Sequence, residues 1–183
     1  MSSLDDLASA PTMPVGGLPG LQELLARAVE LGVRSVAAGG GPFGAVVARL
    51  DGERGTGGAR LVTVAEGTNQ VTSTNDPTAH AEIVAVRAAG TVLGTFDLSG
   101  CVLLASCEPC PMCLTAGLWA RVDAMWFAAT RSDAAAAGFE DVALYRALET
   151  PREQWAVPVR ALAVPFPTAP FDAWARASAR TTY

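Results

Sequence analysis

Two separated groups of polar residues constrain the fold of this chain more than any other feature of its sequence. The single histidine, His80, lies two residues before Glu82, and the later segment Pro-Cys-Pro-Met-Cys contributes Cys110 and Cys113. Both groups stand at the start of a predicted helix. One imidazole nitrogen and two thiolates are a ligand set that zinc accepts with tetrahedral geometry. A zinc site of this composition requires the fold to bring the two helix starts together.

The number of ligands indicates what kind of zinc site this is. Structural zinc sites are usually closed by four protein ligands, whereas His80, Cys110 and Cys113 leave the fourth position to water. Zinc lowers the pKa of a bound water molecule to roughly 7, which makes hydroxide available at neutral pH. Glu82, beside the ligands, is suited to moving protons. The sequence therefore predicts a catalytic site with one Zn²⁺ per chain.

Other interpretations compete for the same residues. A lone histidine is most often a packed or surface residue, and CxxC alone occurs in redox-active sites. The proline between Cys110 and Cys113 and the upstream His80 disfavour a redox site. Cys101 and Cys107 would complete a four-ligand structural site, but the spacing is too crowded for the usual two pairs, so we expect both to be small buried residues. A Ser-His-Asp triad would need the same histidine and lacks a nucleophile motif.

Composition places the chain among compact globular proteins. Half of its 183 residues are hydrophobic and 17% are charged, with a net charge of -5 and no lysine. We expect a flexible leader over residues 1–20 and one domain over 21–183. An acidic chain repels phosphate, so nucleic acid is not an expected partner. The sequence has no signal-peptide pattern and no apolar run of about 18 residues, which predicts no membrane contact and a cytoplasmic protein.

Helical and strand patterns alternate along the chain, which favours a layered α/β domain. We expect Thr78 to cap one helix, Gly90 to end that helix, and Pro111 to occupy the first position of the next. The predicted helices cover 21–39, 78–90, 111–121, 141–149 and 171–180. The predicted strands cover 43–50, 61–69, 101–106, 123–130 and 156–164.

Longer stretches resemble a known group of enzymes. They read GGPFGAVV, EGTNQVTSTNDPTAHAE, SCEPCPMC and AAAAGFEDVALYR. HxE followed by PCxxC is the signature of zinc deaminases, and these stretches resemble the cytidine deaminase-like superfamily and, within it, the bacterial guanine deaminases. The resemblance implies a three-layer cytidine deaminase-like fold, in which helices flank a five-stranded mixed sheet. By the resemblance, His80, Cys110 and Cys113 match the zinc ligands and Glu82 matches the proton shuttle.

The resemblance also assigns roles outside the metal motif. It matches Asn69 to a residue that binds the purine, Asp141 to an acid that assists proton transfer, and Phe43 and Trp119 to aromatic residues of the base pocket. Tyr183 matches a terminal residue that closes over the substrate, in a segment that the subunits of a homodimer exchange. From the sequence alone, the asparagine suits a turn equally well. A tryptophan in a helix is more often a core residue, and an aspartate at a helix start is commonly a cap.

Four departures from the family pattern leave every catalytic group in place. The leader over 1–20 has no counterpart, Leu118 stands where an aromatic residue is commoner, Glu140 replaces an aspartate, and the hairpin turn over 51–60 is longer than usual. Leu118 and the hairpin turn bear on substrate choice. The resemblance implies hydrolysis of guanine, a small purine base, to xanthine and ammonia. The alternatives are guanosine, cytosine or an aminated triazine as substrate, tRNA adenosine deamination, and a zinc-stabilised binding protein without turnover.

Overall fold

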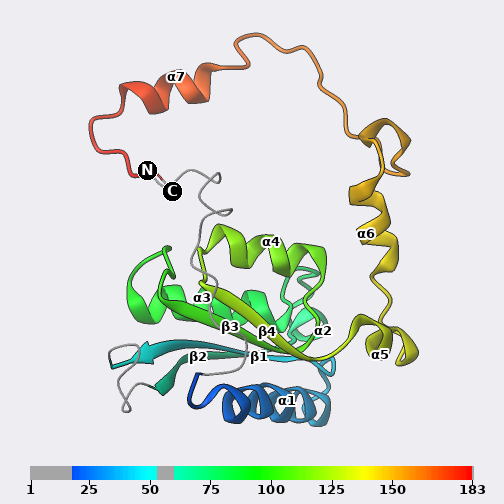
Figure 1. The fold of residues 1–183 in the computed structure, drawn as a ribbon. Coiled ribbons are helices and arrows are strands. Elements are labelled where there is room, and N and C mark those ends of the chain that lie inside the picture. The colour runs from blue at the N-terminus through cyan, green and yellow to red at the C-terminus, as the bar shows by residue number, and fades with distance from the viewer. Residues whose placement is uncertain (1–17, 53–59, 183) are drawn as a thin grey trace.

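A four-stranded mixed sheet forms the centre of the computed structural model, which describes residues 18–52 and 60–182 (Figure 1). Its strands are β1 Gly44–Asp51, β2 Arg60–Thr68, β3 Cys101–Cys107 and β4 Ala124–Ala129. They lie in the order β2-β1-β3-β4. Strand β1 pairs antiparallel with both β2 and β3, whereas β3 and β4 are parallel.

Helices cover both faces of this sheet, which makes three layers. Helix α1 packs on one face, and α3 and α4 lie together on the other (Figure 1). The helices are α1 Leu21–Ala37, α2 Val71–Thr74, α3 Ala81–Leu93, α4 Pro111–Trp119, α5 Arg131–Ala136, α6 Val142–Glu149 and α7 Ala169–Arg176, with a 3-10 turn at Arg152–Gln154. The three-layer α/β prediction is therefore confirmed.

The sheet separates two apolar cores. Successive side chains of a strand point to opposite faces, so Val46 packs in the core on the α1 side and Val47 in the core on the α3 side. Every residue of β3 is buried. Cys101 and Cys107 belong to this strand and are buried, as the sequence predicted. The strand that leads to the metal-binding cysteines is thus held rigidly from both sides.

Two glycines set how closely the helices approach the sheet. A Cβ on Gly44 would lie 2.6 Å from the backbone nitrogen of Gly32 in α1. A Cβ on Gly67 would lie 2.6 Å from the backbone nitrogen of Ala85 in α3. Real Cβ contacts are longer than this, so any larger residue would push the helix away. Gly67 therefore fixes the depth of α3, the helix that begins beside His80.

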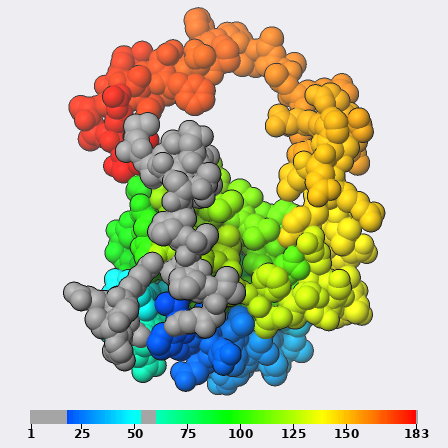
Figure 2. All heavy atoms as spheres, in the orientation of Figure 1, coloured from blue at the N-terminus to red at the C-terminus, as the bar shows by residue number. Residues whose placement is uncertain are grey.

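The prediction of a fifth strand over 156–164 is wrong. This segment is irregular, and its apolar side chains are exposed, with Val157 at 72% and Leu162 at 85%. A strand needs a neighbour that accepts and donates backbone hydrogen bonds. The segment lies in the part of the chain from 150 to 182, here called the C-terminal arm, which arches away from the sheet (Figures 1 and 2). It has no strand to pair with.

Two predicted helix boundaries also differ. His80, not Thr78, is the N-cap of α3, because Asp76 accepts hydrogen bonds from both the backbone and the hydroxyl of Thr78 and holds it in the preceding turn. The helix passes through Gly90 and ends at Gly94, whose φ of 66° suits glycine. The prediction for Pro111 is confirmed, since it occupies the first turn of α4. None of the helices in the described ranges is long and apolar enough to span a membrane.

Candidate active site

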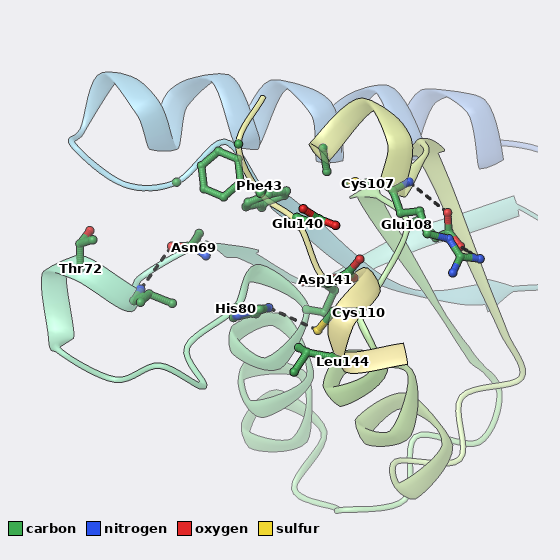
Figure 3. A pocket seen from close by; sticks show the side chains of 17 residues that line it. Phe43, Asn69, Thr72, His80, Cys107, Glu108, Cys110, Glu140, Asp141 and Leu144 are labelled. Carbon is green, nitrogen blue, oxygen red and sulfur yellow. Dashed lines mark hydrogen bonds and ion pairs between the residues drawn. The ribbon is translucent and has the colours of Figure 1, made fainter. Parts of the chain in front are cut away.

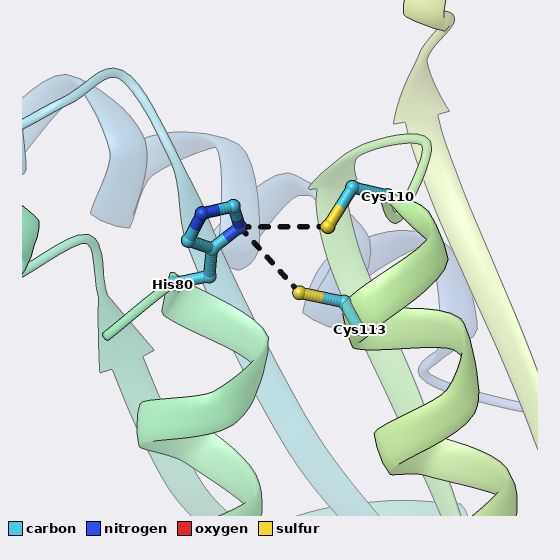
Figure 4. Close-up of side chains that lie close together, drawn as sticks. All are labelled: His80, Cys110 and Cys113. Carbon is cyan, nitrogen blue, oxygen red and sulfur yellow. Dashed lines mark hydrogen bonds between the residues drawn. The ribbon is translucent and has the colours of Figure 1, made fainter. Parts of the chain in front are cut away.

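The predicted ligands meet where α3 and α4 begin. His80 is the N-cap of α3 and Cys110 is the N-cap of α4, so both side chains project from helix starts that lie side by side (Figure 4). The His80 Nδ1 atom is 3.6 Å from the Sγ atoms of Cys110 and Cys113. All three ligand atoms lie within 4.8 Å of one another. The fold therefore assembles the set that the sequence predicted.

These distances fit zinc. A tetrahedral zinc ion with bonds of about 2.05 Å to nitrogen and about 2.3 Å to sulfur holds these atoms roughly 3.6 Å apart. Soft thiolates together with one imidazole also favour zinc over magnesium or calcium, which prefer oxygen ligands. Three protein ligands leave one coordination position free for water.

The two thiols are electrostatically unequal. The Cys113 thiol donates a hydrogen bond to Cys110, and this contact, with a further one from His80, lowers the pKa of Cys110 to about 4. The same contact and burial raise the pKa of Cys113. The hydrogen bond with Cys110 raises the pKa of His80. Since the thiolate is the form that ligates metals, the site already favours one thiolate, and a bound cation favours both.

Glu82 lies in the first turn of α3, beside the ligand cluster. Its side chain lines the same cavity, and only 8% of the residue is exposed. Burial disfavours the charged carboxylate and raises the pKa of Glu82. A carboxyl group that both accepts and returns a proton suits general acid–base catalysis.

A second carboxyl group approaches the cluster from another helix. Asp141 is the N-cap position of α6, but its side chain makes no capping hydrogen bond. Partial burial, and then the nearby Cys110 thiolate, raise the pKa of Asp141. Asp141 thus stands at the helix start, where a cap residue is expected, but its side chain lines the cavity that His80 and Cys110 also line (Figure 3).

A cavity of about 450 Å³ lies above these groups (Figure 3). Its volume falls within the range of about 300–1,000 Å³ that is usual for small-molecule sites. Its lining combines groups that can catalyse a reaction, namely metal ligands and carboxyl groups, with groups that can bind a substrate, namely an amide and aromatic rings. The lining includes Phe43, Asn69, His80, Glu82, Cys110, Phe139, Glu140, Asp141 and Leu144.

Backbone contacts fix the amide and the rings. Asn69 donates its backbone N–H to the carbonyl of Phe43, and its side-chain oxygen accepts a hydrogen bond from Val71 at 3.3 Å. Gly41 leaves room for this amide, since a Cβ there would lie 3.1 Å from Asn69 Oδ1. The rings of Phe43 and Phe139 meet edge to face at 5.1 Å. Asn69 is thus more than a turn residue, because its side chain also borders the cavity.

With this geometry established, comparison with known proteins places the chain. Residues 20–129 match the model of the cytidine and deoxycytidylate deaminase zinc-binding region. This chain belongs to that deaminase family. The matched residues contain the whole ligand set and Glu82, so the zinc site is the feature that the chain shares with its family. Helices α5 and α6, which carry Phe139 and Asp141 into the cavity, lie beyond the matched region.

Individual relatives extend the similarity beyond that region. The chain is 46% identical over 154 residues to guanine deaminase of Bacillus subtilis, covering 84% of this chain and 92% of the relative. The crystal structure of a guanine deaminase from Bacillus subtilis matches with a TM-score of 0.79 at 44% identity, over 88% and 98% of the two chains. A guanine deaminase from Nitrosomonas europaea matches at 0.58 and 36%, over 74% and 72%. A tRNA-specific adenosine deaminase of Haemophilus influenzae is 32% identical over 70% and 72%.

The fold places one of the predicted site residues, Trp119, away from the cavity. Trp119 is 55% exposed at the end of α4 and borders a groove on the outer side of α3 and α4, so it does not line the cavity of its own protomer. Leu118, its neighbour, is 41% exposed. Tyr183 lies outside the described residues, as do residues 1–17 of the predicted leader and most of the long hairpin turn.

Three other residues that line the cavity were not predicted from the sequence. Phe139 lies in the quoted AGFED segment, and its position beside two acidic residues was the available signal. Thr72 reaches the cavity from α2, a single helical turn too short to predict. Arg131 reaches it from α5, whose start carries a capping box between Thr130 and Asp133 that the sequence does display.

Proposed function

We propose that this deaminase hydrolyses guanine to xanthine and ammonia. One observation carries the proposal: a buried glutamate, a side-chain amide and two members of the three-ligand zinc set, His80 and Cys110, border one cavity. The similarity to guanine deaminases supports the choice of substrate, because it spans nearly all of the relative's length. The same similarity includes α5 and α6, which the broader family model leaves out.

In the reaction, the oxygen of water adds to the ring carbon that carries the exocyclic amine, and a proton is added to the neighbouring ring nitrogen. A C–O bond forms, the C–N bond breaks, and two proton transfers are needed to release the nitrogen as ammonia. Zinc, when bound by His80, Cys110 and Cys113, supplies a Lewis acid that brings the pKa of a coordinated water to about 7. The protein's own residues then have to move the protons.

Glu82 is assigned the first proton transfer. It borders the cavity beside the ligands, and burial holds its pKa above the ordinary range, so it takes a proton from water and delivers it to a ring nitrogen. Asp141 is assigned to the proton that the leaving amine requires. It enters the cavity from α6 with a carboxyl group that no capping bond engages.

Asn69 and the two phenylalanines are assigned to the base. An amide offers both a donor and an acceptor, which suits the edge of a purine. The paired rings of Phe43 and Phe139 form an apolar wall for its flat face. Glu140 also borders the cavity and adds a carboxylate for the N–H groups of guanine. If a C-terminal tyrosine closes over this cavity, a free base is favoured over a nucleoside, because ribose needs additional room.

The C-terminal arm supports a homodimer in which subunits exchange this segment. Large apolar side chains are exposed along it, including Leu162 at 85%, Phe166 at 84% and Phe171 at 73%. Monomeric proteins rarely expose so much contiguous apolar surface. A second copy of the chain would cover the arm, and it would bring the partner's Tyr183 over the cavity. Trp119 and its groove beside α3 and α4 are assigned to the contact between subunits.

The four free cysteines fit a reducing compartment, and we assign the protein to the cytoplasm. Disulfides persist in oxidising compartments, where exposed thiol pairs such as CxxC tend to oxidise. The metal-ligand role proposed for Cys110 and Cys113 requires them to stay reduced.

Deamination of adenosine in tRNA is the second candidate, because a tRNA-specific relative matches most of the chain. RNA-binding domains carry a basic footprint. This chain has a net charge of -5 and no lysine, which disfavours the candidate. A salt-sensitive complex with tRNA in a gel-shift assay would support it.

Ammonia release from zinc-loaded protein tests the proposal. Guanine, guanosine, adenine, cytosine and cytidine are offered in parallel, and we expect rapid turnover of guanine alone. Turnover of guanosine or a pyrimidine would keep the mechanism and refute the assigned substrate. Stoichiometric zinc without ammonia release from any base would instead favour a zinc-stabilised binding protein.

A further inference from the structure

The segment from 130 to 149 forms one wall of the cavity but is weakly held. It supplies Phe139, Glu140, Asp141 and Leu144 to the lining. Helices α5 and α6 contain no buried residue in the part of the chain that the structure describes. A catalytic carboxyl group must nevertheless be held within fractions of an ångström. Some specific contact therefore has to fix α6 against residues 108–110, which connect β3 to α4 and are here called the ligand loop.

Tyr145 makes such a contact. Its hydroxyl donates a 2.8 Å hydrogen bond to the backbone carbonyl of Pro109, and this bond is partly buried. Pro109 is fully buried and directly precedes the ligand Cys110. The hydroxyl therefore joins a half-buried residue of α6 to a fully buried residue of the ligand loop.

A charged pair reinforces the same junction. Glu108 accepts one hydrogen bond from the backbone N–H of Arg131 at 3.0 Å and forms an ion pair with its guanidinium at 3.1 Å (Figure 3). The guanidinium carbon lies 4.5 Å from the centre of the Tyr145 ring. The guanidinium contacts one face of the ring, and the hydroxyl is the group that reaches the ligand loop.

Because Tyr145 and Asp141 belong to the same helical turn, the contact of Tyr145 with Pro109 also constrains the position of Asp141. Tyr145 is four residues after Asp141, and residues at this spacing share one face of a helix. The backbone N–H of Tyr145 donates to the carbonyl of Asp141 at 3.3 Å, closing the first turn of α6. The Asp141 side chain makes no capping hydrogen bond to the helix, so the position of its carboxyl group depends on where the start of α6 is placed.

We propose that Tyr145 is a positioning residue for deamination: its hydroxyl fixes α6 on the ligand loop and so holds Asp141 at the site of proton transfer. The proposal rests on the function assigned to Asp141 above. It concerns a residue that touches neither the substrate nor the metal, so removing the hydroxyl should change the rate of the chemical step while leaving the binding of both intact.

The substitution Tyr145→Phe removes the hydroxyl and keeps the ring beside Arg131. We expect kcat to fall about three- to tenfold, the effect of losing one hydrogen bond in the transition state, with KM and zinc content unchanged. Trp155→Phe is the matched control, because Trp155 donates a comparable hydrogen bond to the carbonyl of Thr150 at the other end of the helix. This control should leave kcat as in the wild type.

A double-mutant cycle with Asp141→Asn identifies the route of the effect. If Tyr145 acts through Asp141, Tyr145→Phe causes no further loss of kcat in the Asp141→Asn background. Equal losses in both backgrounds would overturn the proposal, as would a wild-type kcat for Tyr145→Phe. Loss of zinc from that variant would also overturn it, since the hydroxyl would then serve the ligand loop rather than α6.

Hydrogen exchange tests the role of Tyr145 independently of which base is the substrate, because it does not depend on turnover. Backbone amides of 141–149 should exchange faster in zinc-loaded Tyr145→Phe than in the wild type and in Trp155→Phe. If another base proves to be the substrate, the same cycle is measured on that base. If no base is turned over, unchanged exchange in Tyr145→Phe overturns the anchor, and faster exchange supports it while the proposed function fails.

Discussion

Glu82 and Asp141 reach the same ligand cluster from different helices and in different surroundings. Glu82, in the first turn of α3, is almost completely buried beside the ligands, whereas Asp141, at the start of α6, is only half-buried. Burial raises the pKa of both carboxyl groups. Two acids with distinct environments can divide a reaction that needs two proton transfers.

Replacing Glu82 by glutamine tests the central role. The amide keeps the size of the side chain but cannot accept a proton, so we expect kcat to fall by about 10²–10⁴-fold while zinc remains bound. Ammonia release and metal analysis measure the two effects on the same sample. Glu23→Gln, an exposed carboxylate of α1, is the control and should keep full activity. Substantial turnover by Glu82→Gln would contradict the assignment.

At the residue scale, the sequence predicts chemistry best where the chemistry is local. His80 and Glu82, like Cys110 and Cys113, are separated by one turn or less, so their spacing alone describes each half of the site. Phe139 acts in the cavity only because a chain reversal brings it to Phe43. Such pairings depend on tertiary structure, and no spacing along the chain displays them.

At the scale of elements, close packing of helix on sheet determines where the ligands stand. Gly67→Ala would force a methyl group onto the backbone of Ala85, which cannot yield. We expect a loss of about 1–3 kcal/mol in the free energy of unfolding. Because α3 carries His80, we also expect zinc affinity to fall about tenfold or more. Urea unfolding and zinc titration measure the two quantities.

The sheet offers a matched control on its other face. Gly44→Ala meets the backbone of Gly32 in α1 in the same way, but α1 carries no ligand. This variant should lose similar stability while its folded fraction keeps the wild-type zinc affinity. Equal zinc affinity in the two variants would show that the depth of α3 does not control the site.

A forked ion pair ties α1 to the edge strand β2. Arg27 donates to both carboxylate oxygens of Glu66, at 2.7 and 2.8 Å, and lowers the pKa of Glu66 from its ordinary 4.5. A lowered folded-state pKa contributes stability that is present above pH 4.5 and lost as the pH falls through the lower value. Glu66→Gln should therefore be less stable than the wild type at pH 7, and the difference should shrink below pH 4.5.

Urea unfolding at a series of pH values measures this difference. Both groups are partly exposed, so the effect at pH 7 is small and should decrease with added salt. Glu23→Gln on the same helix serves as the control and should match the wild type throughout. A constant difference between Glu66→Gln and the wild type at all pH values would mean that packing, not charge, accounts for the loss.

Sequence patterns identified most elements because apolar residues recur at helical spacing or gather in short runs between turn residues. Helices α1 and α6 show the helical spacing and strands β1 to β4 the short apolar runs, and their predicted ranges agree with the structure to within a few residues. The segment 156–164 has a strand-like composition as well, yet it forms no strand. Composition indicates whether a segment prefers the extended conformation of a strand. A strand also requires a neighbouring strand to pair with, and the single chain places none beside this segment.

At the scale of the whole molecule, the exposed apolar side chains of the C-terminal arm are the feature that packing within a single chain does not explain. It extends from α6 across open space to α7, and its apolar side chains contact little of their own protomer (Figure 2). An exchanged arm would bury these side chains in a dimer of about twice 18.8 kDa. It would also mean that each active site is completed by the Tyr183 of the partner subunit.

Mixing two inactive variants distinguishes exchange from closure within one chain. Glu82→Gln lacks the proton shuttle, and Tyr183→Ala lacks the residue proposed to close the cavity, so each homodimer should be nearly inactive. In an exchanged heterodimer, the Tyr183→Ala subunit retains Glu82 and receives Tyr183 from its Glu82→Gln partner. After the two are unfolded and refolded together, random pairing should restore roughly a quarter of the wild-type activity.

Closure within one chain gives the opposite result. Each heterodimer would then contain one site without Glu82 and one without Tyr183, and ammonia release would stay at the level of the separate variants. Co-refolding wild type with Glu82→Gln is the control, because it measures how much activity survives the refolding step. Light scattering on the mixture establishes that dimers have formed, so that absence of recovery reports where Tyr183 acts rather than failed assembly.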